Sequence, residues 1–594
     1  MQTGMAIRGG SFLTSDISPS EIFTPEDVTR DQLMIMKIAQ DFVQKEVKPH
    51  IDRLLQQDLP LNRSLMLKAG QQGLLGADID QEYEGKGLDK IASTLIVAAS
   101  TGADVFSITW NAHSGIGTLP IVIFGNESQK EKYLPGLARG TSIAAYALTE
   151  PAAGSDALSI QTRAVLSPDG KHYVLNGEKI FISNAGLADV FIAYAKVDGD
   201  KFTALVVERG YPGISIGPEI KKMGIRGSST ATVFFKGTPV PAENVLYEIG
   251  RGYEVAFCIL DLGRFRLAVA CTEMGKIAIE HSVRYAKQRV QFGKPISQFG
   301  LIQQKLANMA IKTYISESMV YRTTGLLKQA FSGVDKKAPD YGKQMYGRIS
   351  EFTVEYSISK VFASEALSDI VDEAVQIYGG RGYIEGNPAE RMYRDSRINR
   401  IFEGTNEINQ LLMVRWLLRK ATAGEIPLFP IAQQLMSELP AITPVSPGLH
   451  DGPLGYQQRL LDLAKKIFIL IFGAAARKYG AEIENEEEIL GYLSNIMIEI
   501  FAMENGLLRA MKSMAAVGEE KSALKIDMAR VYVSDAMRKI EDCSVQVLAA
   551  IETGDAPTTQ LASLRKLARL TPIDTISARR RIAAAVIDAE KYVC

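Results

Sequence analysis

The sequence contains few of the residues that build disulfide frameworks or metal sites. Among its 594 residues there are only four cysteines and five histidines. The cysteines are Cys258, Cys271, Cys543 and Cys594; they form no CxxC pair, and the histidines are equally dispersed. Disulfide frameworks and Cys/His zinc sites need these residues at close, regular spacing. We therefore expect reduced thiols and no bound metal.

The sequence also lacks an excess of either charge. Its 67 Lys and Arg residues nearly balance 68 Asp and Glu residues, and it has no basic block. Proteins whose main partner is a nucleic acid carry clustered positive charge. We therefore expect no nucleic-acid partner. The hydrophobic fraction of 46% is that of a folded globular protein.

No hydrophobic run is long enough to cross a membrane. The longest, residues 467–476, falls well short of the roughly 18 residues that a spanning helix needs. Residues 1–14 contain a single Arg and no apolar core, unlike a secretory or organellar leader. We expect a cytoplasmic protein, with peripheral attachment to a membrane left open.

The hydrophobic pattern that is present changes its period along the chain. Residues 1–145 are helix-patterned, with helices expected at 31–43 and 128–137, and residues 146–255 hold short β-rich runs. Residues 256–420 are helical again, 421–455 form a proline-rich linker, and 456–594 form a helical extension. Asn176-Gly177 lies between two β-rich runs and predicts a hairpin. The predicted fold is mainly α with a middle antiparallel β-barrel domain.

The common single-motif signatures of enzymes are missing. The sequence has no GxGxxG between a strand and a helix, no P-loop, no HExxH and no GxSxG. The function therefore has to be argued from less familiar segments.

Glu403 is the strongest candidate for a catalytic residue. It follows the bulky apolar residues Ile401 and Phe402. Apolar neighbours disfavour the charged form of a carboxylate and raise its pKa towards neutrality, which suits a general base. The N–H of Gly404 is available to a developing oxyanion. The structural alternative is that Thr405 caps a helix that begins here.

A second candidate segment spans residues 146–156. It offers the hydroxyls of Thr149 and Ser155 and a tight turn at Gly154. Such a loop can hold a polar ring edge or a phosphate. The alternative is an ordinary Pro/Gly turn at the surface.

Five short segments, taken together, point to a family. They are residues 146–156, Phe181-Ile-Ser-Asn, Arg289-Val-Gln-Phe-Gly, Gln376-Ile-Tyr-Gly-Gly and Phe402-Glu-Gly-Thr. In this order and at these separations they resemble the acyl-CoA dehydrogenase family of FAD flavoproteins, over about residues 32–418. The extension further resembles the very-long-chain subgroup. The resemblance implies a helical domain, a β-barrel and a helical bundle, in that order.

The resemblance also implies the residues that contact the flavin. Leu148 and Thr149 would contact the flavin ring, and Ser155 the acyl-CoA or an FAD phosphate. Phe181 stands where the family has a Trp that flanks the isoalloxazine. Ser183 stands where it has a Thr whose hydroxyl reaches flavin N5. Both changes keep the aromatic face and the hydroxyl.

Other matched positions would bind the FAD of a neighbouring subunit, which implies a homodimer. They are Arg289, Phe292, Gln376 and Gly380, with Thr405 and Glu407 beside the phosphates. Glu407 and Gly300 each replace a Gln of the shorter-chain members.

Glu403 matches the base that removes the α-proton of the substrate. In the family, the N–H of that Glu and a ribityl hydroxyl of the flavin bind the thioester oxygen, and we also assign Gly404 to substrate binding. Some members place the base where this chain has Gly263, which cannot serve. Asp261 and Arg264 match residues near the CoA adenine and ribose, with a surface ion pair as the alternative.

The implied reaction is the dehydrogenation of acyl-CoA to trans-2-enoyl-CoA in fatty-acid β-oxidation, with electrons passed to an electron-transfer flavoprotein. The alternatives are an acyl-CoA oxidase and a non-catalytic scaffold. Residues 107–117 line the acyl pocket in relatives. There the small Ala112, Ser114 and Gly115 favour a long channel, whereas Trp110 would plug it. We expect long acyl chains, mainly because of the extension.

The extension has two interpretations. Residues 460–472 are amphipathic at their start and almost wholly apolar at their end. They predict either a helix on a membrane surface or, as we favour, a buried helix of a small bundle that packs on the core. Residues 496–503 would supply the partner face.

Overall fold

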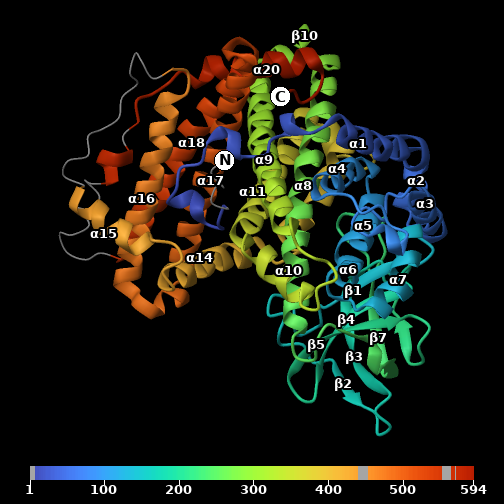
Figure 1. Cartoon of the computed structure of the whole chain (residues 1–594). Helices are drawn as coiled ribbons and strands as arrows, with labels where there is room; N and C mark the ends of the chain where they lie inside the picture. Colours follow the sequence, from blue (N-terminus) through green and yellow to red (C-terminus); the bar gives the residue numbers. More distant parts are fainter. Residues whose placement is uncertain (1–6, 439–451, 552–563, 569) are drawn as a thin grey trace. The chain divides into compact units, whose positions relative to one another are not determined.

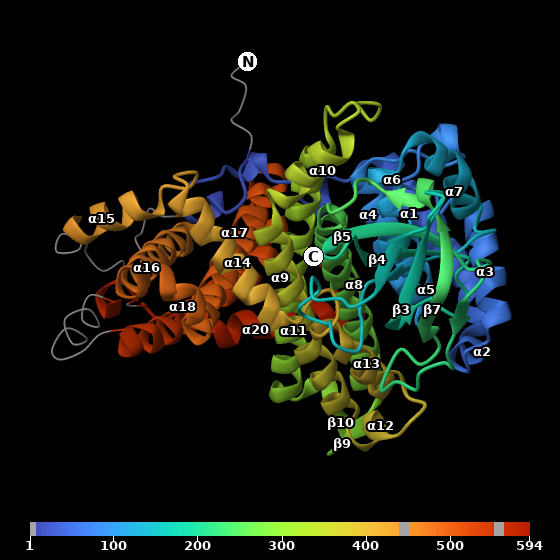
Figure 2. The ribbon, with the colours of Figure 1, turned by 90° about the horizontal axis from the view of Figure 1, so that it is seen from below.

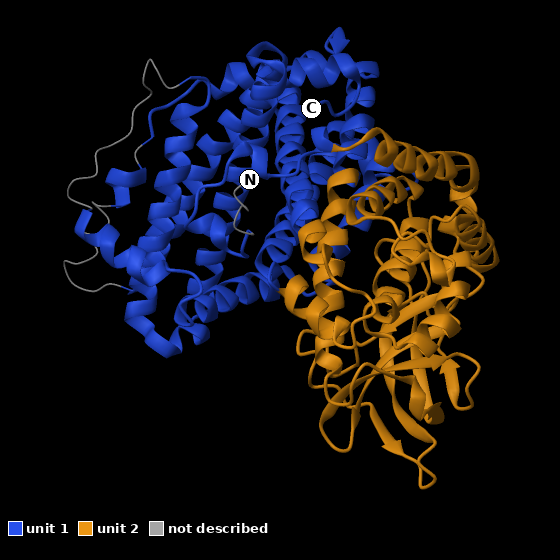
Figure 3. Cartoon of the chain, viewed as in Figure 1, with its two compact units in different colours: residues 1–27, 274–326, 351–594 blue, residues 28–273, 327–350 orange. Residues whose placement is uncertain are grey.

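The computed structural model describes residues 7–438, 452–551, 564–568 and 570–594. The chain divides into two compact units (Figure 3). Unit 1 comprises residues 1–27, 274–326 and 351–594, and unit 2 comprises residues 28–273 and 327–350. Helix α8 (Gly252–Gln288) contributes its first part to unit 2 and its last part to unit 1.

Unit 2 begins with helices that lie within residues 1–145, the segment predicted to be helical (Figure 1). They are α1 (Arg30–Phe42), α3 (Leu59–Gln71), α4 (Lys90–Ser100), α5 (Phe106–Ala112), α6 (Leu119–Phe124) and α7 (Glu127–Arg139). Helix α1 starts at a capping box in which the Thr29 and Gln32 side chains each accept a hydrogen bond from the other's backbone N–H. The predictions of helices at 31–43 and 128–137 are confirmed.

The rest of unit 2 is built around a sheet. Its strands are β1 (Ala144–Ala147), β2 (Arg163–Leu166), β3 (His172–Ser183), β4 (Val190–Val197), β5 (Lys201–Glu208), β6 (Ile214–Ile216), β7 (Thr230–Pro241) and β8 (Val245–Leu246). Their order is β6-β7-β3-β2-β4-β5-β8, with β1 beside β4. The pairings are antiparallel as predicted, except that β1 and β2 run parallel to β4. Alternate side chains, such as Phe191, Leu205 and Val233, form one apolar core.

The hairpin predicted at Asn176-Gly177 is wrong. Strand β3 runs straight through both residues, and its register against β7 shifts between Leu175 and Gly177, which marks a bulge. Gly177 has φ 150°, and a Cβ there would lie 2.3 Å from Thr162 Oγ1. The glycine is therefore needed for close approach to β2. The turn that precedes β3 lies instead around Gly170, whose φ is 72° and whose N–H bonds to Ser167 O.

The helices that follow give unit 1 most of its mass. They are the second part of α8, α9 (Gly300–Phe331, to residue 326), α11 (Thr353–Tyr378), α13 (Pro388–Ser396), α14 (Asn406–Thr422), α15 (Leu428–Glu438), α16 (Gly455–Tyr479), α17 (Glu487–Val517), α18 (Glu519–Ile551) and α20 (Thr575–Ala589). Helix α15 lies within residues 421–455, where we predicted a linker, so part of that stretch is helical. Residues 439–451 of it lie outside the described residues.

The extension packs as a bundle. Helices α16, α17 and α18 lie side by side (Figure 1). Most apolar residues of α16, including Phe468 and Phe472, are buried. Lys465 of α16 forms a buried ion pair with Glu504 of α17 at 2.7 Å. These contacts support the bundle interpretation of residues 460–472. No helix in the described part of the chain is both long and apolar enough to span a bilayer.

Candidate active site

Glu403 lies in a tight loop just before α14. Its φ is 58° and that of Gly404 is 77°, so both residues have left-handed backbone. This conformation is ordinary for glycine and costs about 1 kcal/mol or more for other residues. Thr405 caps α14, because its Oγ1 accepts a hydrogen bond from Ile408 N at 3.2 Å. The helix-cap interpretation of Thr405 is therefore confirmed, and Glu407 is exposed in the first turn.

Two buried polar side chains hold this loop. Lys360 of α11 is fully buried, and its Nζ donates to Gly404 O at 2.8 Å and to Asn406 Oδ1 at 2.7 Å. Asn409 donates from Nδ2 to Gly404 O and Thr405 O, both at 2.9 Å. Because each carbonyl of the turn is fixed from the protein interior, the unusual backbone of Glu403 is maintained. One carboxylate oxygen of Glu403, Oε2, is shielded from solvent.

Four of the predicted FAD contacts lie at one end of unit 1. Arg289 and Phe292 belong to a hairpin of β9 (Val290–Gln291) and β10 (Lys294–Pro295), and Gln376 and Gly380 lie at the end of α11. Stacking of Tyr285 on Tyr378, with ring centroids 4.2 Å apart, joins the ends of α8 and α11. Figure 2 shows the hairpin beside α12 (Gly380–Tyr383). All four residues are exposed, and Phe292 is 94% exposed.

In unit 2, a buried ion pair fixes the loop with Leu148 and Thr149. Lys179 of β3 is fully buried and donates from Nζ to Leu148 O at 3.1 Å and to Glu150 Oε1 at 2.7 Å. Ile180 N donates to Thr149 O at 2.9 Å. Burial lowers the pKa of Lys179 to about 8, although Glu150 opposes this shift. The loop is therefore tied to the same strand that carries Phe181 and Ser183.

Phe181 lies at a second irregularity of β3. The register against β7 shifts between Lys179 and Ile182, and Phe181 has φ 58°. Its ring is 62% exposed, which is unusual for so large an apolar side chain. Bulges of this kind turn a side chain out of the sheet and are frequent beside active sites. Ser183 follows in the strand, opposite Thr230.

The remaining predicted contacts of unit 2 have different environments. Ser155 is exposed in the loop after Leu148. Arg264 Nη1 donates to Asp261 Oδ1 at 2.7 Å on α8, and both residues are buried. We predicted that, if they do not bind CoA, Asp261 and Arg264 form an ion pair on the surface. They do form an ion pair, but it is buried.

Trp110, the predicted plug of the acyl pocket, lies among core residues. It is 1% exposed and packs edge-to-face on Phe42, with ring centroids 5.6 Å apart, inside the helical core of unit 2. The space beside Gly115 is instead filled by Arg266 of α8. A Cβ at position 115 would lie 2.9 Å from Arg266 Nε.

The predicted residues thus fall into two groups. Leu148, Thr149, Ser155, Phe181, Ser183, Asp261 and Arg264 belong to unit 2, and Arg289, Phe292, Gln376, Gly380, Glu403, Gly404, Thr405 and Glu407 belong to unit 1. Sequence reasoning missed the buried residues that hold the two loops, namely Lys179, Lys360 and Asn409. A lysine inside an apolar β-rich run was the available signal for Lys179.

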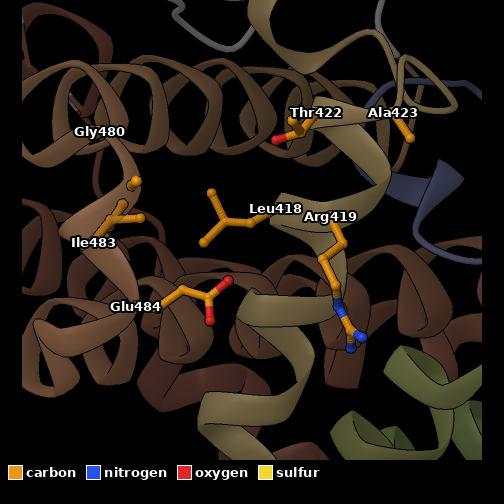
Figure 4. Close-up of a pocket in the computed structure, with 8 residues that line it drawn as sticks. Leu418, Arg419, Thr422, Ala423, Gly480, Ile483 and Glu484 are labelled. Atoms are coloured by element: carbon orange, nitrogen blue, oxygen red, sulfur yellow. The ribbon is translucent and has the colours of Figure 1, made fainter.

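A cavity of about 430 Å³ in unit 1 lies apart from the Glu403 loop. It lies between the end of α14 and the segment Gly480–Asn485. In Figure 4, Leu418 and Ile483 approach each other across it, with Arg419 and Glu484 nearby. The thirteen residues from Thr405 to Leu418 place it about 20 Å along the helix from the Glu403 loop.

Comparison with known proteins assigns the family. Models of the N-terminal, middle and C-terminal domains of acyl-CoA dehydrogenase match residues 29–141, 145–238 and 250–418. A second model, also described as an acyl-CoA dehydrogenase C-terminal domain, matches residues 463–566 in the extension. The chain belongs to the acyl-CoA dehydrogenase family, and the predicted order of helical, β and helical domains with a helical extension is confirmed.

Individual relatives agree with this assignment. The chain is 49% identical to "Probable acyl-CoA dehydrogenase" of Bacillus subtilis (strain 168) over 98% of both chains. It is 40% identical to the mitochondrial very long-chain specific acyl-CoA dehydrogenase of Homo sapiens, over 75% of this chain and 69% of that one. It is similar to the crystal structure of an acyl-CoA dehydrogenase complexed with FAD from Bacillus anthracis. The TM-score is 0.97 and the identity 48%, over 99% of this chain and 100% of that one.

Proposed function

We propose that the protein catalyses the FAD-dependent α,β-dehydrogenation of long-chain acyl-CoA to trans-2-enoyl-CoA, with Glu403 as the catalytic base. The observation that carries the proposal is the loop at Glu403. An energetically costly backbone conformation at a carboxylate, held by Lys360 and Asn409, is typical of a residue whose position matters for function.

The residues present fit FAD. An exposed aromatic ring at Phe181 and the neighbouring hydroxyl of Ser183 offer an apolar face and a polar donor to the flavin. Gly380 has no atom within 4 Å of where a Cβ would stand, which leaves its backbone open to a phosphate. When bound, FAD supplies the acceptor for the two electrons and the hydride that leave the substrate.

The chemistry assigned to the chain is proton removal. The α-proton of a thioester is far too weakly acidic for a free carboxylate, so the carbonyl oxygen must be stabilised as negative charge develops on it. Backbone N–H groups are effective donors for this purpose. We assign the N–H of Glu403 and that of Gly404 to this region of the substrate, and the Glu403 carboxylate takes the α-proton.

The homodimer is proposed because one group of cofactor residues is left exposed. Arg289, Phe292, Gln376 and Gly380 gather at one end of unit 1, where the ring of Phe292 is 94% exposed. In this proposal each subunit uses them to hold the FAD of its partner.

The substrate and the electron acceptor are proposed from the relatives. Long acyl chains and a role in fatty-acid β-oxidation are supported by the name of the human relative and by the matched extension. An electron-transfer flavoprotein is the proposed acceptor. One similar solved structure, at 36% identity and TM-score 0.60, is described as an electron-transferring flavoprotein of Acidaminococcus fermentans.

The flavin absorbance tests the proposal directly. We expect the purified protein to be yellow and to lose its flavin colour when palmitoyl-CoA is added without oxygen. Glu403→Gln should bind palmitoyl-CoA and keep its colour, with Glu488→Gln, at an exposed position of α17, as a matched control that bleaches. Bleaching by Glu403→Gln at the wild-type rate would show that the base lies elsewhere. Rapid reoxidation of the reduced protein in air would favour the oxidase alternative over the dehydrogenase.

A further inference from the structure

Arg266 is an arginine side chain enclosed by three elements of unit 2. Its Nη2 donates to Asn111 Oδ1 at 3.1 Å and to Ser114 Oγ at 2.8 Å. Its Nη1 lies 3.7 Å from Asp78 Oδ2. The side chain is only 14% exposed, so its long, flexible stem is held in one position rather than extended into solvent.

A small polar cavity borders this guanidinium. It has room for about one water molecule. It is lined by the polar residues Asp78, Lys90, Ser93, Thr94 and Arg266, together with apolar residues of α4, α6, α8 and α9. Lys90 Nζ also contacts Asp78, at 2.6 Å. Two cations thus share one carboxylate. Arg266 Nε has no hydrogen-bond partner among the described residues. Burial lowers the pKa of Arg266, which indicates a costly environment for its charge.

Arg266 also occupies the space that small residues leave in the segment 107–117. Because a Cβ at position 115 would lie 2.9 Å from Nε, the guanidinium fits against Gly115 where a larger residue would displace it. The channel that small residues predict on this side is therefore filled from α8.

The same segment is attached to the strands that carry the proposed flavin contacts. Asn184, next to Ser183, donates from Nδ2 to Thr109 O at 2.9 Å. At the start of β1, Ala144 N donates to His113 Nδ1 at 3.0 Å. In the proposed function the acyl chain runs from the flavin contacts along this segment, which Arg266 contacts at Asn111 and Ser114.

We propose that Arg266 ends the acyl-binding channel of unit 2 and so sets the longest acyl chain that the enzyme accepts. This inference rests on the proposed function. A longer alkyl chain would have to push the guanidinium away from Asn111 and Ser114, or expel the water that the cavity can hold beside Nε. Either event leaves a buried donor without a partner, and the expected penalty is about 10- to 100-fold in kcat/KM.

The test compares full-length, FAD-loaded wild type with Arg266→Ala over straight-chain acyl-CoAs from butanoyl- to docosanoyl-CoA. We expect kcat/KM of the wild type to fall beyond a certain chain length. For Arg266→Ala the fall should begin at a longer chain. The ratio of kcat/KM for the first excluded chain to that for octanoyl-CoA should then rise at least about tenfold.

A second variant guards against misfolding. Arg266→Met keeps most of the side-chain volume but removes the donors, and its ratio should rise less than that of Arg266→Ala. The same chain-length profile for wild type and both variants would overturn the inference. If no acyl-CoA of the series reduces the wild-type flavin, the proposed function fails instead.

Discussion

At the residue scale, an energetically costly backbone conformation occurs at the proposed flavin contact Phe181 and at the proposed base Glu403. Phe181 and Glu403 have φ of 58° each, and each belongs to a segment fixed by a buried lysine. Lys179 donates a hydrogen bond to the carbonyl of Leu148, and Lys360 donates one to the carbonyl of Gly404. An ammonium group has three donors and no acceptor, so it can fix backbone carbonyls that no helix or strand satisfies. We therefore infer that both lysines position these segments.

Lys360→Met should lower activity without loss of FAD. The substitution keeps an apolar side chain of similar length but leaves Gly404 O without its ammonium donor, so the Glu403 loop relaxes. A misplacement of about 1 Å can cost about 100-fold in rate. We expect kcat to fall by about that factor, with a smaller change in KM. Lys312→Met, which removes an exposed ion pair with Asp369, is the control and should keep its rate. Equal kcat values would show that Lys360 is not needed to position the loop.

Glu355 should make the protein less stable as pH rises from about 4.5 to about 7. Burial raises the pKa of this carboxyl from 4.5 to about 7, although Oε1 accepts a hydrogen bond from Gly10 N at 2.7 Å. Between these values the folded protein holds a proton that the unfolded chain has released. Its contribution to stability is therefore complete below about pH 4.5 and is lost by about pH 7, a loss on the order of 3 kcal/mol.

Glu355→Gln removes this ionisation and gives the test. At pH 8 the variant should unfold at a higher temperature than wild type, and at pH 5 the difference should shrink. Glu351→Gln is the control, because it loses an ion pair with Lys420 and should gain nothing at pH 8. A midpoint for Glu355→Gln below that of wild type at pH 8 would contradict the prediction.

At the element scale, helices were more predictable than turns. Local signals such as the Thr29 capping box lie within a few residues of each other, so α1 could be placed from sequence. Asn176-Gly177 carried the strongest local signal for a hairpin, yet the glycine allows close contact with Thr162, which directly precedes β2. The contacts that fix the site were equally hidden. Lys360 and Gly404 are 44 positions apart, and no local pattern relates them.

Gly177→Ala should destabilise the β domain strongly. The added methyl would lie 2.3 Å from Thr162 Oγ1 and 2.8 Å from its Cα, so the two strands must separate. We expect a loss of about 2 kcal/mol or more, seen as a lower unfolding midpoint. Gly170→Ala is matched, because its φ of 72° is also unfavourable for alanine but no atom lies within 4 Å; it should cost about 1 kcal/mol. Equal midpoints for the two variants would show that the close strand contact is unimportant.

At the scale of the whole molecule, buried charges join the extension to the dehydrogenase core of unit 1. Arg509 of α17 pairs with Glu317 of α9 at 2.7 Å and with Glu26 at 2.9 Å. Arg322 of α9 pairs with Glu504 of α17 at 2.5 Å. Composition and periodicity predicted a helical extension, but they could not relate residues almost 200 positions apart. Since removing one partner leaves a buried charge uncompensated, the extension is an integral part of unit 1.

Phe468→Asp therefore separates the two interpretations of α16. Phe468 is fully buried in the bundle, so a carboxylate there should cost about 3 kcal/mol or more and lower the unfolding midpoint by several degrees. We expect the full-length wild type to stay unbound when anionic lipid vesicles are floated. Gln458→Asp, at an exposed position of the same helix, should leave both properties unchanged. If α16 were a membrane-surface helix, wild type would float with the vesicles, and Phe468→Asp would abolish flotation with little effect on stability.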